Sequence, residues 1–394
     1  KNTANGSQTL YFNTTGNQNT ATGFKALLSN TTGSNNVAIG YQALLSNTTG
    51  VNNVANGYEA LKENITGGNN VAIGLQALRN NTHSLNVAIG RHALYWNTTG
   101  TQNTATGANT LYKNTTGSQN TAHGRQGLYY NTEGSNNTTS GYRSNHYNTT
   151  GHSNVSSGFE ALYLNTSGYQ NTANGHQSLY SNQTGTRNTA TGHHALQNTT
   201  GQYNTGLGAG AGYNNSTGNN NTYLGKDARA DSTNASYDDT TAIGYNSVVT
   251  ASNQIMLGTS NETVVVPGKI GIGTTSPAHK LDVNGWIKAN NTIVGTNQIL
   301  YLYSNTTSNN SYSFVELGTG ALQLGGPQIN FYSGSTDSIF GTLNMVINSS
   351  GNVGIGTTSP LFKSHVKGNG QVMALEGTDH VYHRLRVNGA NYGY

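Results

Sequence analysis

The sequence predicts an all-β protein: a parallel β-solenoid, which we expect to be trimeric, followed by a β-rich neck and fibre shaft. Three observations predict this fold. The first half repeats with a period of 17 residues, too short for two helices and a turn but sufficient for one solenoid coil. Only 8% of the 394 residues are charged, so 52 glycines and many asparagines and threonines supply turns and polarity. The chain has no cysteine, which excludes a disulfide framework.

Each repeat begins with an asparagine, which we number position 1. Position 2 is always valine or threonine, position 5 is always glycine, and position 9 is leucine in eleven of thirteen units. We expect positions 2 to 4 to form a strand that the glycine ends, and a second short strand to carry position 9. The units start at Asn2, Asn19, Asn36, Asn53, Asn70, Asn86, Asn103, Asn120, Asn137, Asn154, Asn171, Asn188 and Asn204.

Stacking of these coils in register would align the position-9 leucines in one apolar row. Asparagines at the corners would also align, where they can hydrogen-bond to the backbone and to each other. One leucine and one or two alanines or valines per coil make a thin core for a single chain. Three chains around an axis could pool these rows, so we expect a homotrimer.

The repeat pattern of the sequence divides the chain into three parts. Residues 1–220 hold the repeat solenoid, residues 221–268 a neck or transition, and residues 269–394 the fibre shaft. The regular spacing ends after the strand motif at 221–225. We expect the neck to close the solenoid.

The shaft carries the motif Gly-Ile-Gly-Thr-Thr-Ser-Pro twice, at 271–277 and at 354–360. Each copy predicts a strand, a glycine turn, a turn restrained by proline and another strand. Between the two copies, short runs such as 299–301 and 329–331 are strand-like but follow no longer period.

These motifs resemble two families of fibre proteins. The strand motif Asn-Val-Ala-Ile-Gly, as at 36–40, resembles the head repeats of trimeric autotransporter adhesins over about residues 2–258. The usual head repeat is shorter and lacks the Ala-Leu and Asn-Thr-Thr-Gly insertion found here. The shaft motif resembles the modules of phage tail fibres and related bacterial fibre proteins. The resemblances imply a parallel β-roll wound as a trimer and a fibre located outside the cell, at the cell surface or on a virion.

Acidic residues are too scattered to predict an active site. The thirteen units contain Glu59, Glu63, Glu133 and Glu160, which fall at unrelated positions and form no pair suited to acid–base catalysis. We therefore expect a protein that is not an enzyme and that uses no cofactor.

Metal binding is also not expected. The only acidic cluster could offer carboxylates and the Asn234 amide to Ca²⁺, but its spacing does not match a calcium loop, so a solvated junction is favoured. The histidines share no unit position in this interpretation, which favours exposed side chains over a ligand set. The clustered carboxylates belong to Asp227, Asp231, Asp238 and Asp239.

Two partner classes are not expected. A net charge of +4 over the whole chain makes no basic patch for nucleic acid. No apolar run approaches the 18 or so residues of a membrane span.

Asparagine sequons recur at the turns of the repeat. A glycosylating host could modify them, but asparagine and threonine also suit turns and strand edges, and we favour this structural explanation. The sequons include Asn13, Asn30, Asn47, Asn97, Asn114 and Asn148.

Tyrosine recurs at position 10. Side chains that point inward would fill the core, whereas outward rings would form a stripe able to stack on sugars or on other fibres. We favour the outward stripe because position 9 already supplies the buried leucine. The candidate contact residues are Tyr11, Tyr95, Tyr112, Tyr129, Tyr163, Tyr180 and Tyr213.

Together these observations predict a structural and adhesive fibre that attaches to a host-surface glycan or protein receptor through repeated weak contacts. One alternative is a glycan-degrading tail spike, which would require a carboxylate pair in a groove. Another is a self-polymerising surface filament.

Overall fold

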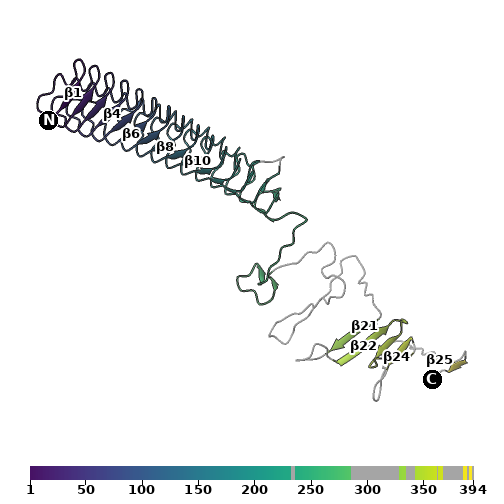
Figure 1. The fold of residues 1–394 in the computed structure, drawn as a ribbon. Helices are drawn as coiled ribbons and strands as arrows, with labels where there is room; N and C mark the ends of the chain where they lie inside the picture. Colours follow the sequence, from purple (N-terminus) through teal and green to yellow (C-terminus); the bar gives the residue numbers. More distant parts are fainter. Residues whose placement is uncertain are drawn as a thin grey trace, which may run out of the picture. The chain divides into compact units, whose positions relative to one another are not determined.

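The computed structural model describes residues 1–231, 236–284, 328–333, 342–361, 363–366, 385–387 and 390–392 (Figure 1). They belong to two compact units, Lys1–Asn284 and Gly285–Tyr394. The described part of the chain contains strands and turns but no helix, which confirms the all-β fold.

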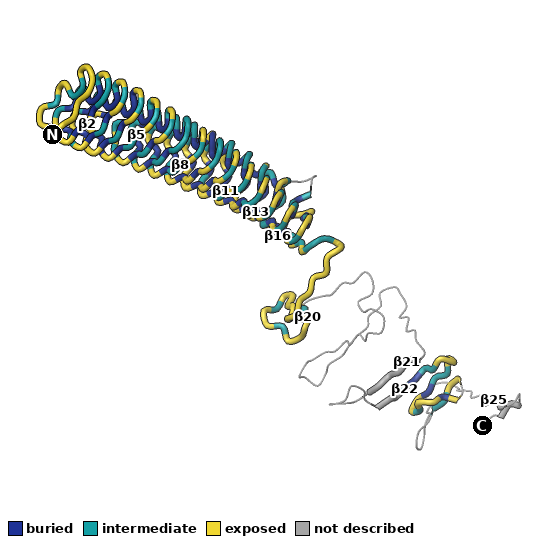
Figure 2. Tube along the Cα trace, in the orientation of Figure 1, coloured by how far each residue is buried: buried dark blue, intermediate teal, exposed yellow. Residues whose placement is uncertain are grey.

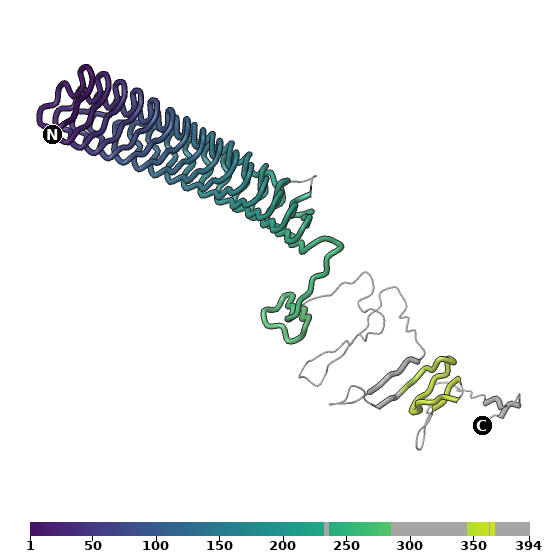
Figure 3. The backbone as a smooth tube through the Cα atoms, viewed as in Figure 1, coloured from purple at the N-terminus to yellow at the C-terminus, as the bar shows by residue number. Residues whose placement is uncertain are grey.

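The first unit is a parallel β-solenoid in which each coil contributes one strand to a single sheet of sixteen strands. Partner residues in neighbouring strands are 17 apart, as in Thr3 with Thr20, or 16 apart at the two shorter units, so each unit forms one coil. Figure 3 shows that the coils follow one another in sequence order along the rod. The strands are β1 (Thr3–Asn5), β2 (Thr20–Thr22), β3 (Val37–Ile39), β4 (Val54–Asn56), β5 (Val71–Ile73), β6 (Val87–Ile89), β7 (Thr104–Thr106), β8 (Thr121–His123), β9 (Thr138–Ser140), β10 (Val155–Ser157), β11 (Thr172–Asn174), β12 (Thr189–Thr191), β13 (Thr205–Leu207), β14 (Thr222–Leu224), β16 (Thr241–Ile243) and β18 (Ile255–Leu257).

Glycine ends each repeat strand because the stacked coils leave no space for a side chain. At Gly158 the backbone φ is 132°, and a Cβ atom would lie 2.5 Å from the carbonyl oxygen of Gly175 in the next coil. Only glycine adopts this backbone conformation readily, and only glycine fits there.

The predicted second strand is wrong for the regular coils, because leucine at position 9 lies in a turn. Leu27 and Leu44 have left-handed φ angles of 50° and 53°. These turns still bond from coil to coil, since the Leu27 amide donates to the Ala43 carbonyl at 3.0 Å. A left-handed leucine costs about 1–2 kcal/mol, which burial of its side chain offsets. A second strand occurs further along the chain as β15 (Arg229–Ala230) and β17 (Val248–Val249), which pair in parallel.

The core lies inside the solenoid of a single chain. Leu27, Leu44 and Leu61, with alanines from the strands and turns, are completely buried. Figure 2 shows that buried stretches recur from coil to coil along the solenoid. Burial of the leucine row therefore does not require three chains, contrary to the expectation from the small number of apolar residues per coil. The core forms two clusters, separated at the coil that carries Asn145 at position 9.

Two rows of buried asparagines connect the coils, as the sequence suggested. At position 1, the Asn53 amide nitrogen Nδ2 donates to the Gly67 carbonyl at 2.9 Å, and its backbone N–H donates to Asn36 Oδ1 at 3.0 Å. At position 12, Asn47 Nδ2 donates to Asn30 Oδ1 at 2.8 Å. Backbone groups at the corners are thereby satisfied without water.

The segment 221–268, predicted as a neck, continues the same sheet, but the spacing between its strands becomes irregular. Residues of β14 and β16 pair at a spacing of 19, and residues of β16 and β18 pair at a spacing of 14. The sheet thus extends to β18 although the 17-residue period ends at β14.

Both Gly-Ile-Gly-Thr-Thr-Ser-Pro copies form a strand, turns and a second strand, as predicted. In the first copy, β19 (Ile270–Ile272) pairs in parallel with β20 (Leu281–Val283). In the second copy, β23 (Val353–Ile355) pairs in parallel with β24 (Ser364–Val366), with the same spacing of 11 residues.

The remaining described strands belong to the second unit. Strand β21 (Gln328–Ser333) includes the predicted run at 329–331 and pairs antiparallel with β22 (Thr342–Asn348), which pairs with β23. Strands β25 (Leu385–Val387) and β26 (Ala390–Tyr392) form an antiparallel pair. The predicted run at 299–301 lies outside the described residues.

Candidate functional site

Five of the seven candidate tyrosines lie in one stack of rings along the solenoid. Neighbouring ring centroids are 5.0–5.4 Å apart and the rings are nearly parallel, because position 10 repeats once per coil. We call this stack the position-10 column, and it consists of Tyr95, Tyr112, Tyr129, His146, Tyr163 and Tyr180.

The other two candidates lie outside this stack. Tyr11 is 67% exposed, and the four coils between it and Tyr95 carry leucine, lysine or arginine at position 10. Tyr213 is 40% exposed and is separated from Tyr180 by the coil with Gln197. Sequence spacing therefore identified the tyrosines at position 10, but it did not show which coils interrupt the stack of rings.

His146 completes the column, and sequence reasoning missed it because it considered tyrosine alone. The imidazole is largely buried, and its Nδ1 donates to the Gln126 carbonyl at 3.0 Å. Burial lowers the pKa of His146, so the ring is neutral and can stack like a tyrosine.

The tyrosines of the column are half-buried and present uncharged edges to solvent. Burial raises the pKa of the Tyr129 and Tyr180 hydroxyls. Burial together with the hydrogen bond to Tyr147 raises the pKa of Tyr163 to about 12. The hydroxyls thus remain protonated at neutral pH and can donate hydrogen bonds.

Position 11 widens this aromatic surface. Tyr130 and Tyr147 stack at 5.0 Å, and Trp96, which is 46% exposed, contacts Tyr95 edge to face. A pocket of about 310 Å³ lies beside them, lined by Tyr130, Tyr147, Thr149, Leu164, Thr166 and Gln183.

A second aromatic column lies at position 6, directly after the strand-ending glycine. Sequence analysis missed it because phenylalanine, tyrosine and histidine alternate there. One stack contains Phe24, Tyr41 and Tyr58, and the other contains Tyr142, Phe159, His176 and His193. The inference that histidines share no unit position was wrong, since His176 and His193 stack in successive coils at 5.0 Å.

Among the glutamates that the structure describes, the most buried one is held in an ion-pair cluster. Glu59 contacts Lys62 at 2.8 Å and Arg79 at 2.9 Å. Burial alone would raise its pKa, but hydrogen bonds from Lys62, Arg79 and Gln76 outweigh burial and lower the pKa to about 2. Such a carboxylate stays ionised and is unsuited to donate a proton near neutral pH.

The clustered aspartates also take part in coil-to-coil contacts. Asp238 accepts the Asn219 backbone N–H at 2.6 Å, and Asp239 accepts Asn220 Nδ2 at 3.0 Å. Asp227 lies 3.8 Å from the Lys226 ammonium. These contacts fit the predicted junction, while Asn234 lies outside the described residues.

The six sequon asparagines named above lie at position 12. Asn13 is half-buried and the other five are completely buried, and each donates its amide group to a neighbouring coil or to its own turn, as Asn114 does to Asn97 Oδ1 at 2.6 Å. The structural explanation therefore accounts for Asn30, Asn47, Asn97, Asn114 and Asn148.

No protein-family model matches this chain, and no curated protein matches it either. The class of protein is therefore defined by its fold alone. The fold is a parallel β-solenoid with stacked aromatic side chains along its coils. Within the described residues, no helix has the length and apolar character needed to cross a bilayer.

Proposed function

We propose that this protein is a structural and adhesive fibre that acts outside the cell, at a cell surface or on a virion. The observation that supports the proposal most directly is the position-10 column, in which flat rings recur once per coil on a regular scaffold. The ring edges, with their hydroxyl groups, can pack against sugar rings and donate hydrogen bonds to sugar oxygens. Each contact would be weak, and repetition would provide avidity.

The column would make these contacts with little loss of side-chain conformational entropy on binding. Its rings are already held in place by neighbours at 5.0–5.4 Å, so binding would immobilise few side chains. A host-surface glycan is therefore the partner that we favour, with a protein receptor as the second option.

We propose that attachment involves no catalysis. The ion-paired state of Glu59 supports this view, and Glu160 accepts a hydrogen bond from Gln177 at 3.0 Å and lies 3.9 Å from Arg143. A glycan-degrading spike would need an acid whose pKa lies near the working pH.

The binding test compares two pairs of substitutions that fit the repeat. Tyr112→Leu with Tyr129→Leu alters the position-10 column, where Leu28 and Leu45 occupy the same position in other coils. We expect at least about tenfold weaker binding to immobilised host or capsular polysaccharides, because two exposed ring edges and their hydroxyl groups are lost.

The matched control is Tyr41→Leu with Tyr58→Leu in the position-6 column, where Leu75 occurs naturally. It should leave binding unchanged. Equal binding by all three proteins would contradict the proposal, and release of oligosaccharides would favour the tail spike.

We also propose that the fibre is a homotrimer. A row of aliphatic side chains on β13, β14, β16 and β18 supports association, since each is 37–48% exposed and they neighbour one another in the sheet. The row consists of Leu207, Leu224, Ile243 and Leu257.

Native mass determination tests this assembly. The wild-type protein should have three times the mass of its chain. Leu224→Asn with Ile243→Asn should weaken the trimer, and Asn56 and Asn174 show that the fold accepts asparagine at this position. A wild-type monomer would contradict the trimer while leaving the binding proposal open to its own test.

A further inference from the structure

Three histidines converge at one place on the solenoid. His176 follows β11, and His193 and His194 follow β12 in the next coil. Ring nitrogens of the three imidazoles all lie within 4.8 Å of one another. The ring centroids of His193 and His194 are 3.7 Å apart, and those of His176 and His193 are 5.0 Å apart.

We propose that His176, His193 and His194 bind one divalent transition-metal ion, with Zn²⁺ as the reference ion. Three imidazoles are an established type of zinc ligand set, with Zn–N distances of about 2.0–2.1 Å. Tetrahedral binding would place ligand nitrogens about 3.3 Å apart. Rotation of side chains that already lie within 4.8 Å can supply this difference, since His176 and His193 are exposed.

The position-6 column alone does not account for this cluster. His176 and His193 continue the stack that begins with Tyr142 and Phe159, so these two rings have an aromatic role. His194 lies at position 7, where other regular coils carry residues such as glutamine and glutamate, and its ring stacks on His193 as a third imidazole from outside that column.

The protonation state of His194 suits a metal ligand. Burial lowers the pKa of His194, and the neighbouring His193 and His176 lower it further. The neutral form is thereby favoured, and a neutral imidazole can bind an ion through a ring nitrogen.

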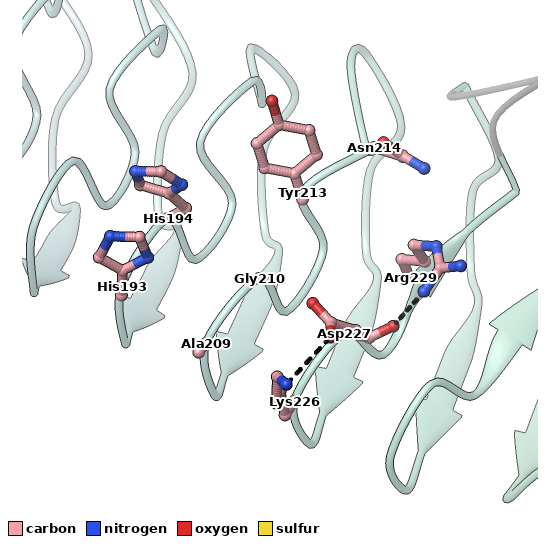
Figure 4. A pocket seen from close by; sticks show the side chains of 9 residues that line it. All are labelled: His193, His194, Ala209, Gly210, Tyr213, Asn214, Lys226, Asp227 and Arg229. Carbon is pink, nitrogen blue, oxygen red and sulfur yellow. Dashed lines mark hydrogen bonds and ion pairs between the residues drawn. The ribbon is translucent and has the colours of Figure 1, made fainter.

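The cluster borders a pocket of about 360 Å³. Figure 4 shows His193 and His194 on one wall and Lys226, Asp227 and Arg229 on the opposite wall. Position 7 of the coil between the walls is glycine, so no side chain fills this space. An ion on the three imidazoles would therefore keep a coordination position accessible to water or to a small ligand.

Positive charge across the pocket is partly neutralised by its own contacts. Lys226 lies 3.8 Å from an Asp227 carboxylate oxygen. Arg229 donates to the Asp227 carbonyl at 2.9 Å and also to Asn246 Oδ1. The Asp227 carboxylate thus lowers the repulsion that Lys226 would exert on a bound metal ion.

The experiment measures binding of Zn²⁺ and Co²⁺ to the full chain by calorimetry and by the visible spectrum of Co²⁺. We expect one ion per chain at this cluster, together with a rise in Tm on Zn²⁺ addition. His194→Gln should weaken binding by at least about tenfold, because even loss of a group that only orients a ligand costs about 10- to 100-fold. Glutamine is the natural residue at this position in the coils of Gln126 and Gln177.

The matched control is His92→Gln, which makes the same change at position 7 of a coil where position 6 is Arg91. It should leave affinity and the Tm shift unchanged. A second variant, His176→Phe with His193→Phe, preserves ring stacking and should abolish the site. The proposal is overturned if the wild-type protein binds neither ion in the micromolar range, or if these folded variants bind as the wild type does.

Discussion

The solenoid coils and the two Gly-Ile-Gly-Thr-Thr-Ser-Pro modules use the same parallel pairing at different spacings. Strands pair 17 residues apart in regular coils and 11 apart in the modules. The consequence for burial is large. Leu111 is completely buried in the solenoid, whereas Ile272 and Leu281 of the first module are 54% and 55% exposed.

The difference shows that repetition, more than strand pairing itself, makes a stable core. A regular coil is covered on both sides by other coils, so its alanine and leucine leave water entirely. The first module forms a sheet of only two short strands, and such a pair is marginally stable without further packing, whereas β23 of the second module also pairs with β22. We therefore expect the solenoid to fold within one chain and the modules to depend on additional contacts.

Glycine substitutions should give the largest difference in stability loss between the solenoid and the region of the second module. In Gly158→Ala, strain at a φ of 132° and a Cβ only 2.5 Å from the next coil should destabilise the solenoid by at least about 3 kcal/mol. In Gly351→Ala, φ is 71° and Lys363 Nζ at 3.6 Å is the nearest contact, so a cost of about 1 kcal/mol is expected. Urea unfolding measures both, and equal costs would remove the distinction.

Leucine truncation tests the difference in burial. Leu111→Ala should lower the free energy of unfolding by about 2–5 kcal/mol, because it leaves a cavity between coils. Leu281→Ala, made at an exposed side chain, should change it by less than about 0.5 kcal/mol in the isolated chain. Thermal melts followed by circular dichroism compare the variants. A large loss in Leu281→Ala would mean that the module has a core of its own.

Asn145→Leu should make the solenoid more regular. Asn145 is completely buried, and its side-chain amide forms no hydrogen bond within the described part of the chain. Leucine would continue the row between Leu128 and Leu162, with an expected gain of about 1–3 kcal/mol in unfolding free energy.

The control for this gain is Asn148→Leu. That substitution removes hydrogen bonds to Asn131 Oδ1 and the Gly151 carbonyl, so it should destabilise the protein. A loss of stability in Asn145→Leu would show that this polar break in the core is required.

The smallest expected effect concerns charge. Because the pKa of Glu59 falls from 4.5 to about 2 on folding, its contribution is complete above about pH 4.5 and disappears as the pH falls towards 2. Glu59→Gln should cost about 1 kcal/mol at pH 7, the upper end for ion pairs near the protein surface, and should reduce the acid dependence of stability. Urea midpoints at pH 7 and pH 3 measure it, and an unchanged pH dependence would assign acid sensitivity to other groups.

Much of the solenoid was predictable because each recurring residue meets a local structural requirement of the coil. The invariant glycine, the valine or threonine at position 2 and the corner asparagines each have one role that recurs in every coil. Prediction of a second strand failed because leucine rarely adopts a left-handed backbone, and only packing between coils offsets that cost at residues such as Leu27.

The candidate surface was partly predictable for the same reason. Spacing placed Tyr112 and Tyr129 in one row, but it could not show that His146 fills the same row or that the coil of Gln197 interrupts it. The His176, His193 and His194 cluster required the register of two coils and the rotamers of three side chains.

The sequence by itself determined the coil length, the parallel register and the residues that line the interior, because a strict period places the same side chain at the same point of every coil. Only the tertiary structure decided which turn conformation carries the leucine, whether one chain can bury the core, and which rings and imidazoles meet. Those outcomes depend on contacts between coils, whose free energies exceed the local preferences that sequence patterns report.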